Sequence, residues 1–520
     1  MLTSEGRSTV GVVSPAVYSS RSRLWRVLEA AYPVRFEPRE AGQWRGLDAV
    51  IMIGDSNVEA PPSIPSLITG PICGGNSKAQ IAFCRDAPSP FAGRALSEST
   101  SIGPPVTGDV ALALSGAGTV WSASNVGAVV FRSSVAPLEL GADERLKDHL
   151  RAGRFYALLP LVHFLRHVTR ETAWAPPALR ASYIIDDPNL RWKSYGWLDY
   201  DAVESHAQRH GYHLGVAMIP LDSVLTLSVA VRRFRTSNYL SILIHGNNHV
   251  KHELTQNSGD AAMALVAQAL RRIARFESRH QMSVGRVMVP PHVVCSAEMM
   301  EALRRIGFDA IAHDTEPGGD EVQRALTGWD IADLHLGGGF PGMHRNVLDT
   351  QVDELRIRAY LGQPLLLYGH HNDLAGGLDL LAVGAARVAE VGDAQWSSCA
   401  AIARSSVATR VDGDTMRLRM WSRRAEVQIP PGIGRLAVEV PWAARRSAWE
   451  RVRVGPLVVP LGEAVDVIAG QPAKVALMAD DRVDPVDVPG PAWHPWPILR
   501  RCMTEGRDRL LPLRAAMTQR

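Results

Sequence analysis

The sequence has little cysteine and almost no net charge, and it lacks long apolar runs. Its five cysteines are scattered and form no Cys-x-x-Cys pair, so we expect no disulfide framework and a reducing compartment. Basic residues number 56 and acidic residues 53, and such a balance does not predict a nucleic-acid partner. Because no run of eighteen apolar residues occurs, we also predict no membrane span.

Two motifs that would indicate other functions are missing as well. The N-terminus has no apolar segment of the kind that a secretory signal peptide carries, so we expect a cytoplasmic protein. Much Ala, Arg and Gly with little Lys is typical of a GC-rich bacterial genome.

No Gly-x-Gly-x-x-Gly follows the strand that ends at Gly54-Asp55-Ser56-Asn57. That strand end either holds a ligand or is a simple turn into a loop.

The length of 520 residues predicts two to four domains. Strand-like runs at Val10–Val13 and Ala49–Asp55 flank a helical pattern at Ser22–Tyr32, which predicts an N-terminal α/β domain over residues 1–175. A leucine-rich stretch at 144–170 is expected to form one helix near the end of this domain.

In the rest of the chain, the pattern of apolar and polar residues changes twice. Over residues 180–405, apolar strand-like runs alternate with helical patterns, which predicts a parallel (β/α) barrel. Over 406–483, alternation at period two predicts an antiparallel, sandwich-like β module. Residues 484–520 are expected to pack as a C-terminal tail. The glycine run 337–342 is expected to form a mobile loop over the barrel mouth.

Two polar clusters each close a predicted barrel strand. Asp186 and Asp187 follow one apolar run, and His245 and His249 close another. An α/β barrel carries its chemistry at this end of its strands. Two imidazoles and a carboxylate suit Zn²⁺ or a similar divalent ion with open positions for water. Such an ion makes water acidic, and the second aspartate can take the proton. We therefore predict a metal-dependent hydrolase.

A separate acid is needed to protonate the leaving group. His370 and His371 follow the apolar run Pro364–Tyr368, and imidazole titrates in the right range. Since side chains alternate along a strand, both cannot face the site, and we favour His370. Other residues have two interpretations, site or structure: Asn248, His252, His292, and the aromatic side chains Trp192, Tyr195 and Trp197, which suit either sugar stacking or packing.

In order and spacing, these motifs resemble those of the polysaccharide deacetylase (NodB-homology) family, carbohydrate esterases on a distorted (β/α) barrel. The resemblance covers about residues 180–405. It implies that Asp186 is the catalytic base and that Asp187, His245 and His249 hold the metal. The family's late Leu-x-His motif resembles Leu367-Tyr368-Gly369-His370, which is one residue longer, and implies that His370 is the acid.

Three positions depart from the family pattern. Gly246 stands where the family has Ser or Thr, and Pro188-Asn189 follows the aspartates in place of Gly-Pro. The family's Pro segment contains an Arg that orients the base. Here that segment is Met288-Val289-Pro290-Pro291-His292, without Arg, and His292 is the candidate for its place.

The expected protein is thus a metal-dependent carbohydrate deacetylase, a hydrolase of C–N bonds other than peptide bonds or of the matching esters. It would use one divalent ion, with Zn²⁺ expected, and an acetylated carbohydrate substrate. The missing Arg and the additional domains favour an alternative, a non-catalytic carbohydrate-binding or scaffold protein of a polysaccharide biosynthesis system. A glycoside hydrolase would need a second carboxylate across the cleft from Asp186, and we identify none in the sequence.

Overall fold

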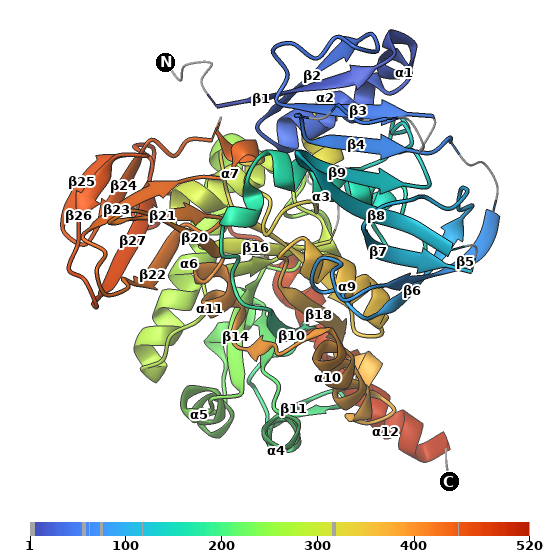
Figure 1. The fold of residues 1–520 in the computed structure, drawn as a ribbon. Helices are drawn as coiled ribbons and strands as arrows, with labels where there is room; N and C mark the ends of the chain where they lie inside the picture. Colours follow the sequence, from blue (N-terminus) through green and yellow to red (C-terminus); the bar gives the residue numbers. More distant parts are fainter. Residues whose placement is uncertain are drawn as a thin grey trace. The chain divides into compact units, whose positions relative to one another are not determined.

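The computed structural model describes residues 6–54, 59–61, 63–72, 76–116, 118–314, 319–445 and 447–518. Asp55, Ser56 and Asn57, considered above as a ligand-binding strand end, lie outside the described residues. The chain forms two compact units (Figure 1). The first comprises residues 1–175, 320–329 and 356–361, and the second comprises residues 176–319, 330–355 and 362–520.

The first unit is built on a mixed nine-stranded sheet in the order β2-β1-β3-β4-β9-β8-β7-β5-β6. The strands from β2 to β9 in this order pair in parallel, and the remaining ones pair antiparallel. Its strands are β1 Ser8–Val13, β2 Val34–Arg39, β3 Ala49–Ile53, β4 Ser66–Thr69, β5 Asn76–Phe83, β6 Ala95–Thr100, β7 Val110–Ser115, β8 Gly118–Val126 and β9 Ala128–Ser133. Its helices are α1 Pro15–Ser19, α2 Ser22–Ala31, α3 Leu159–Val168 and α8 Glu321–Leu326.

The single helix predicted over 144–170 is wrong. The structure has a 3₁₀ turn at Leu146–His149 and then α3 at Leu159–Val168. Between them, the backbones of Arg151 and Arg154 bond to each other around Gly153, which has φ +79. A residue in the left-handed region ends a helix, and the Arg154 side chain is held by Glu144 at 2.8 Å.

The second unit contains a closed parallel barrel, which confirms the predicted fold class. The strand order is β13-β14-β15-β16-β17-β18-β10, and β10 pairs back with β13 to close it, while β19 adds to β10 outside the ring. The strands are β10 Arg180–Asp186, β13 Leu214–Met218, β14 Leu240–His245, β15 Val287–Val289, β16 Ala310–His313, β17 Gly342–Val347, β18 Leu365–His370 and β19 Gln395–Trp396. β10 is buried along its whole length, as expected for a parallel strand covered on both faces.

Helices connect the barrel strands, and most begin or end at residues with a cap preference. The Ser296 hydroxyl accepts from the Met299 N–H at 3.2 Å, and Gly307 at φ +113 ends the same helix. The bounds are α4 Tyr200–His210, α5 Ser228–Thr236, α6 Gly259–His280, α7 Ala297–Ile306, α9 Val352–Tyr360, α10 Asp379–Val391 and α11 Cys399–Arg404, with a small hairpin of β11 Ser194–Tyr195 and β12 Leu198–Asp199. α9 is shared between the two units.

The glycine run 337–342 does not form a loop over the barrel mouth. It precedes β17, so it lies at the N-terminal end of the barrel strands, away from the end that carries the aspartates. The Trp449 indole N–H donates to the Gly339 carbonyl at 2.8 Å, and the Ala448 N–H donates to the Gly338 carbonyl. The loop therefore joins the barrel to the β module.

The predicted β module consists of two four-stranded sheets, β20-β21-β23-β26 and β22-β27-β24-β25. Pairing is antiparallel except between β21 and β23, which run parallel. The exception follows from the topology, because the chain passes through β22 in the other sheet between these strands. The bounds are β20 Val407–Asp412, β21 Thr415–Met420, β22 Arg424–Gln428, β23 Arg435–Glu439, β24 Arg451–Val454, β25 Leu457–Pro460, β26 Ala464–Asp466 and β27 Pro472–Met478.

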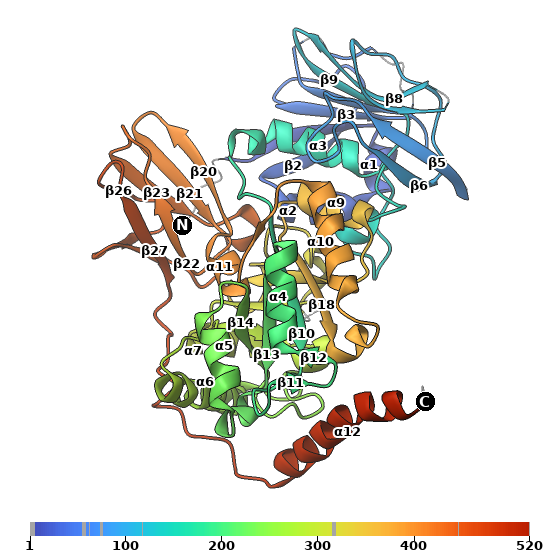
Figure 2. The same ribbon diagram turned by 90° about the horizontal axis from the view of Figure 1, so that it is seen from below.

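The tail ends in a long helix, α12 Trp496–Thr518, which is docked on the carboxyl ends of the barrel strands (Figure 2). The Arg501 guanidinium donates to the Asp222 carboxylate at 2.7 Å and to the Asp187 carbonyl at 2.9 Å. Tyr195 donates to Asp508 at 2.7 Å. Arg501 and Asp222 are both buried, so this pair anchors the helix. Among the described residues, no helix has the length and apolarity to span a membrane.

Replacing Arg501 with alanine should release α12. The change leaves the fully buried Asp222 with less counter-charge, and breaking a buried pair costs about 3 to 5 kcal/mol. The matched control is Arg507→Ala on the same helix, because Arg507 is largely exposed and, among the described residues, forms an ion pair with Asp508 alone. Hydrogen exchange in residues 496–518 should accelerate in R501A and stay near the parent rate in R507A. Equal protection in both variants would contradict the anchoring role.

Candidate metal centre

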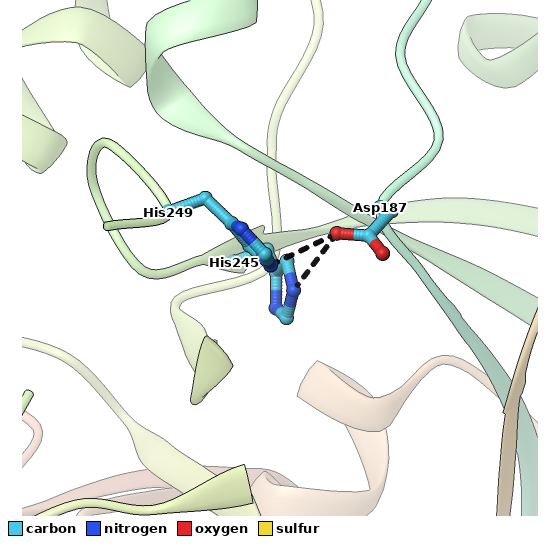
Figure 3. Close-up of side chains that lie close together, drawn as sticks. All are labelled: Asp187, His245 and His249. Carbon is cyan, nitrogen blue, oxygen red and sulfur yellow. Dashed lines mark ion pairs between the residues drawn. The ribbon is translucent and has the colours of Figure 1, made fainter. Parts of the chain in front are cut away.

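The two adjacent aspartates at the end of β10 face different partners. Asp186 is the last residue of the strand, and both of its oxygens accept from Arg345 Nη1, at 3.2 and 3.0 Å. Asp187 has φ +82 and leaves the strand direction. Its Oδ1 lies 3.0 Å from His249 Nε2 and 3.4 Å from His245 Nε2 (Figure 3). The turn in the backbone thus gives neighbouring carboxylates separate positions.

The donor set of Asp187, His245 and His249 fits a divalent cation. Their ligand atoms all lie within 4.8 Å of one another. Within the described residues, buried Asp187 Oδ1 has no hydrogen bond of good geometry, although both imidazoles are close. Ligand atoms that point to one common position, without good hydrogen bonds to one another, are what a shared central ion requires. Two imidazoles with one carboxylate are typical Zn²⁺ ligands.

The rings are already oriented for ligation. His245 Nδ1 lies 2.9 Å from the Val289 carbonyl, so Nδ1 carries a proton, and Nε2 is the ring nitrogen that faces Asp187. Burial alone would raise the pKa of Asp187, but the two facing imidazoles hold it well below its usual range. Burial would lower the pKa of His245, and Asp187 and Asp186 raise it instead. The carboxylate is therefore ionised, as a metal ligand must be.

The turn that carries His249 is organised by one buried carboxylate. Glu253 accepts the backbone N–H groups of Asn247, Asn248 and His249 at 2.9, 3.0 and 3.0 Å. A side chain at Gly246 would place its Cβ 2.1 Å from Glu253 Oε1, and the residue has φ +60. This explains the departure from Ser or Thr at 246, because the Glu253 carboxylate fills that space.

Arg345 is the site residue that sequence reasoning missed. It belongs to β17, is fully buried, and packs 4.0 Å above the Tyr368 ring, whose hydroxyl donates to Asp314 at 2.5 Å. An arginine from β17, and not one from the Pro segment, therefore pairs with Asp186. Asp186 is paired with Arg345 and not with His292, which corrects the expectation for His292. β17 reads Gly-Met-His-Arg-Asn-Val, so polar residues flank Arg345 on both sides and no apolar pattern singled it out in the sequence.

The two candidate acids have opposite environments. His370 is exposed and is in register with Asp186 on the neighbouring strand. His371 is buried, stacks on Trp197 and lies 3.7 Å from Asp508 of α12. A group that exchanges a proton with substrate must be reachable, which favours His370.

The remaining candidates, Asn248, His252 and His292, lie around the site. Asn248 Oδ1 accepts from Arg272 at 2.7 Å. His252 is exposed, and its carbonyl accepts from Thr255. The His292 ring lies 5.2 Å from that of His249 and is exposed; partial burial and then the nearby His249 lower its pKa.

The three aromatic residues after β10 differ in exposure. Tyr195 is fully buried, Trp197 is half-buried against His371, and Trp192 is exposed. Of the three, Trp192 has the most exposed ring, with the Arg509 guanidinium 5.7 Å from its centroid.

No protein-family model matches the chain, and no curated protein does either. Solved structures that match include a mutant of a carbohydrate esterase family 4 pseudoenzyme from Bacillus anthracis with restored activity (13% identity, 41% of this chain, 64% of that chain, TM-score 0.26). Others are a polysaccharide deacetylase from Bacillus cereus (12%, 42%, 91%, 0.25) and a family 4 carbohydrate esterase from Streptomyces lividans in complex with acetate (11%, 42%, 88%, 0.23).

Metal analysis tests the centre directly. The purified parent should carry about one divalent ion per chain after reconstitution, since three converging protein ligands suffice for a catalytic site. Asp187→Ala and His245→Ala should each lose it. His252→Ala is the control, because it removes an exposed imidazole seven residues along from His245 and should keep the ion. An ion content unchanged in D187A would refute the assignment.

Gly246→Ala should disturb the turn. Gly259→Ala is the matched control, because Gly259 has a similar φ of +52 with no atom within 4 Å of the new Cβ. Both variants lose about 1 to 2 kcal/mol from left-handed backbone. Only G246A also displaces the Glu253 carboxylate, so its unfolding free energy and its affinity for the ion should fall further than those of G259A. Equal losses in both would show that the close contact does not matter.

Proposed function

We propose that the second unit is a metal-dependent hydrolase that removes acetyl groups from a carbohydrate, acting on a C–N bond or on the corresponding ester. The observation that carries this proposal is the convergence of Asp187, His245 and His249 at the carboxyl end of a closed barrel, beside Asp186 held by Arg345. In an α/β barrel this end is where chemistry takes place.

Asp187, His245 and His249 would hold one divalent ion, with Zn²⁺ the expected species. Bound there, the ion supplies Lewis acidity to the acyl oxygen and increases the acidity of water. Asp186 would take the proton of the attacking water, and Arg345 Nη1, which donates to both of its oxygens, keeps its carboxylate directed to one position. Water oxygen forms the new bond to the acyl carbon, and the bond from that carbon to nitrogen or oxygen breaks.

His370 would protonate the leaving amine or alcohol. It ends β18 beside Asp186, and its backbone N–H donates to Asp373 Oδ2 at 2.7 Å, which fixes the start of the following turn. Its side chain is exposed, so it can reach a bound substrate. Buried His371 would instead hold the loop that includes Trp197, because its ring packs on that residue.

An acetylated carbohydrate is the substrate class that the mouth of the barrel suits. Trp192 is 61% exposed on the loop after β10, and the face of an indole ring packs against the apolar face of a sugar. Arg509 of α12 lies 5.7 Å from this ring and adds a donor for hydroxyl groups. No described helix spans a membrane, and the balanced charge of +3 does not favour nucleic acid.

The alternative is a non-catalytic carbohydrate-binding or scaffold protein. The missing Arg of the Pro segment favoured it, and Arg345 removes that argument by pairing with Asp186. The remaining observation in its favour is α12, whose Arg501 bonds to the Asp187 carbonyl at the same end of the barrel. Metal binding without acetate release from any acetylated sugar would support this alternative.

Acetate release from oligomers of an N-acetylated amino sugar, and separately from O-acetylated sugars, tests the catalytic proposal. Asp186→Asn should lower kcat by about 10²- to 10⁴-fold, the usual contribution of a general base. Arg345→Met should lower kcat by about 10- to 100-fold, as for other residues that orient a catalytic group. KM should change little in both, because neither residue is expected to set substrate affinity.

Bound ion is the control for both variants, because neither residue is a proposed ligand. D186N and R345M should therefore retain the ion that D187A loses. Full activity in D186N would exclude Asp186 as the base, and full activity in R345M would show that the arginine serves only stability.

A further inference from the structure

A cavity of about 110 Å³ lies where α7 of the barrel meets the β module. Trp449 and Asp481 form part of its wall. The rest is dominated by arginines from the end of α7, from β24, from the start of β22 and from the segment after β27: Arg304, Arg305, Arg423, Arg424, Arg453 and Arg482. We call this cavity the arginine pocket.

The arginine pocket is separate from the metal centre. α7 begins after β15 and ends before β16, so its last turn, with Arg304 and Arg305, lies at the N-terminal end of the barrel strands. Asp187 follows the carboxyl end of β10. The two sites are therefore at opposite ends of the barrel, and residues of the proposed catalytic machinery do not line the pocket.

The positive charge around the pocket exceeds the negative charge. Asp481 is the one carboxylate in the lining, and Arg304 already binds both of its oxygens, at 2.8 and 2.5 Å. Arg424 is paired with Asp309 at 2.6 Å, which Arg404 also contacts at 3.0 Å. Arg305 also approaches Asp481, at 3.6 Å. Asp481 and Asp309 are therefore each shared by two arginines.

Three of the arginines have no carboxylate partner within the described part of the chain. Arg423 is 8% exposed, and its guanidinium donates to the Phe308 carbonyl at 2.9 Å. Arg453 and Arg482 form no ion pair with a described residue and are exposed on the pocket rim. Burial, and then repulsion from Arg482, lowers the pKa of Arg423 to about 10. Uncompensated guanidinium groups at a cavity favour an anionic occupant.

The size and the donors of the pocket narrow the class of occupant. Pockets for whole small molecules begin at about 300 Å³, so a cavity of about 110 Å³ holds one group and not a complete sugar or nucleotide. Guanidinium forks match tetrahedral oxyanions with paired hydrogen bonds. Three arginines without a carboxylate partner among the described residues also match a doubly charged group better than a single carboxylate.

We propose that the arginine pocket binds a dianionic tetrahedral oxyanion, a phosphoryl or sulfate group, carried by a larger ligand that extends into solvent. Arg423 forms the buried floor of the site, and Arg453 and Arg482 close over the group from the β module. The proposal does not depend on the hydrolase assignment, because it rests on residues at the other end of the barrel.

Calorimetric titration of the full chain with inorganic phosphate, sulfate and acetate, at constant ionic strength set by chloride, tests the proposal. Saturable binding of one phosphate or sulfate, at least tenfold tighter than acetate, is expected. Whichever of the two binds more tightly identifies the group that the natural ligand carries. An absence of saturable binding for both, or acetate binding as tightly, would overturn the proposal.

Variants localise the binding. Arg453→Gln combined with Arg482→Gln should weaken it tenfold or more, and both positions are exposed, so the fold should persist. The control is Arg451→Gln, which removes the same charge from the same strand but pairs with Asp480 and does not line the cavity. It should change affinity less than twofold. Parent-like affinity in the double variant would refute the pocket, whereas parent-like affinity in His245→Ala would separate it from the metal centre.

Discussion

The geometry of the proposed metal centre depends on the Glu253 carboxylate. Three consecutive N–H groups converge on it, and this turns the chain sharply directly after β14. Without that turn, His249 would continue away from the strand end, and only His245 would face Asp187. The carboxylate needs the space that a Cβ at Gly246 would fill. The buried Glu253 carboxylate and the lack of a side chain at Gly246 thus depend on each other. The difference from the Ser or Thr of the family pattern at 246 follows from this dependence.

The backbone conformation of Asp187 separates the side chains of the two adjacent aspartates. A strand places successive side chains on opposite faces, and Asp187 escapes this alternation because its φ is +82. Asp186 stays in the barrel, fixed by Arg345, while Asp187 turns to the histidines. Adjacent residues therefore occupy different electrostatic surroundings, one beside a guanidinium and one beside two imidazoles. Such a division suits the proposed roles, with Asp186 as the base and Asp187 as the metal ligand.

The sequence was sufficient for features that depend on local pattern. Apolar runs of strand length predicted the barrel. Because parallel strands align their carboxyl ends, the sequence also predicted that Asp187 and His245 lie at the same end of the barrel. It was not sufficient where distant segments decide the outcome. The helical pattern at 144–170 is interrupted because the Glu98 carboxylate, in β6, accepts the backbone N–H groups of Phe155 and Tyr156 at 2.9 and 2.8 Å. The docking of α12 depends on Asp222, which is nearly three hundred residues away from Arg501 in the chain.

Arg345 contacts Asp186 from a different part of the chain than the Pro segment in which the motif places an arginine. A motif records where residues stand along the chain, but Asp186 requires only a guanidinium at a given point in space. β17 and β10 are both neighbours of β18, so an arginine on β17 reaches Asp186 by crossing the β18 face, where it packs on Tyr368. A closed barrel directs side chains from every strand to one interior, and several strands can therefore supply the same group. The lack of Arg in the Pro segment therefore does not decide whether the Asp186 carboxylate is held in one orientation. The contacts inside the barrel decide it, and there Arg345 holds Asp186.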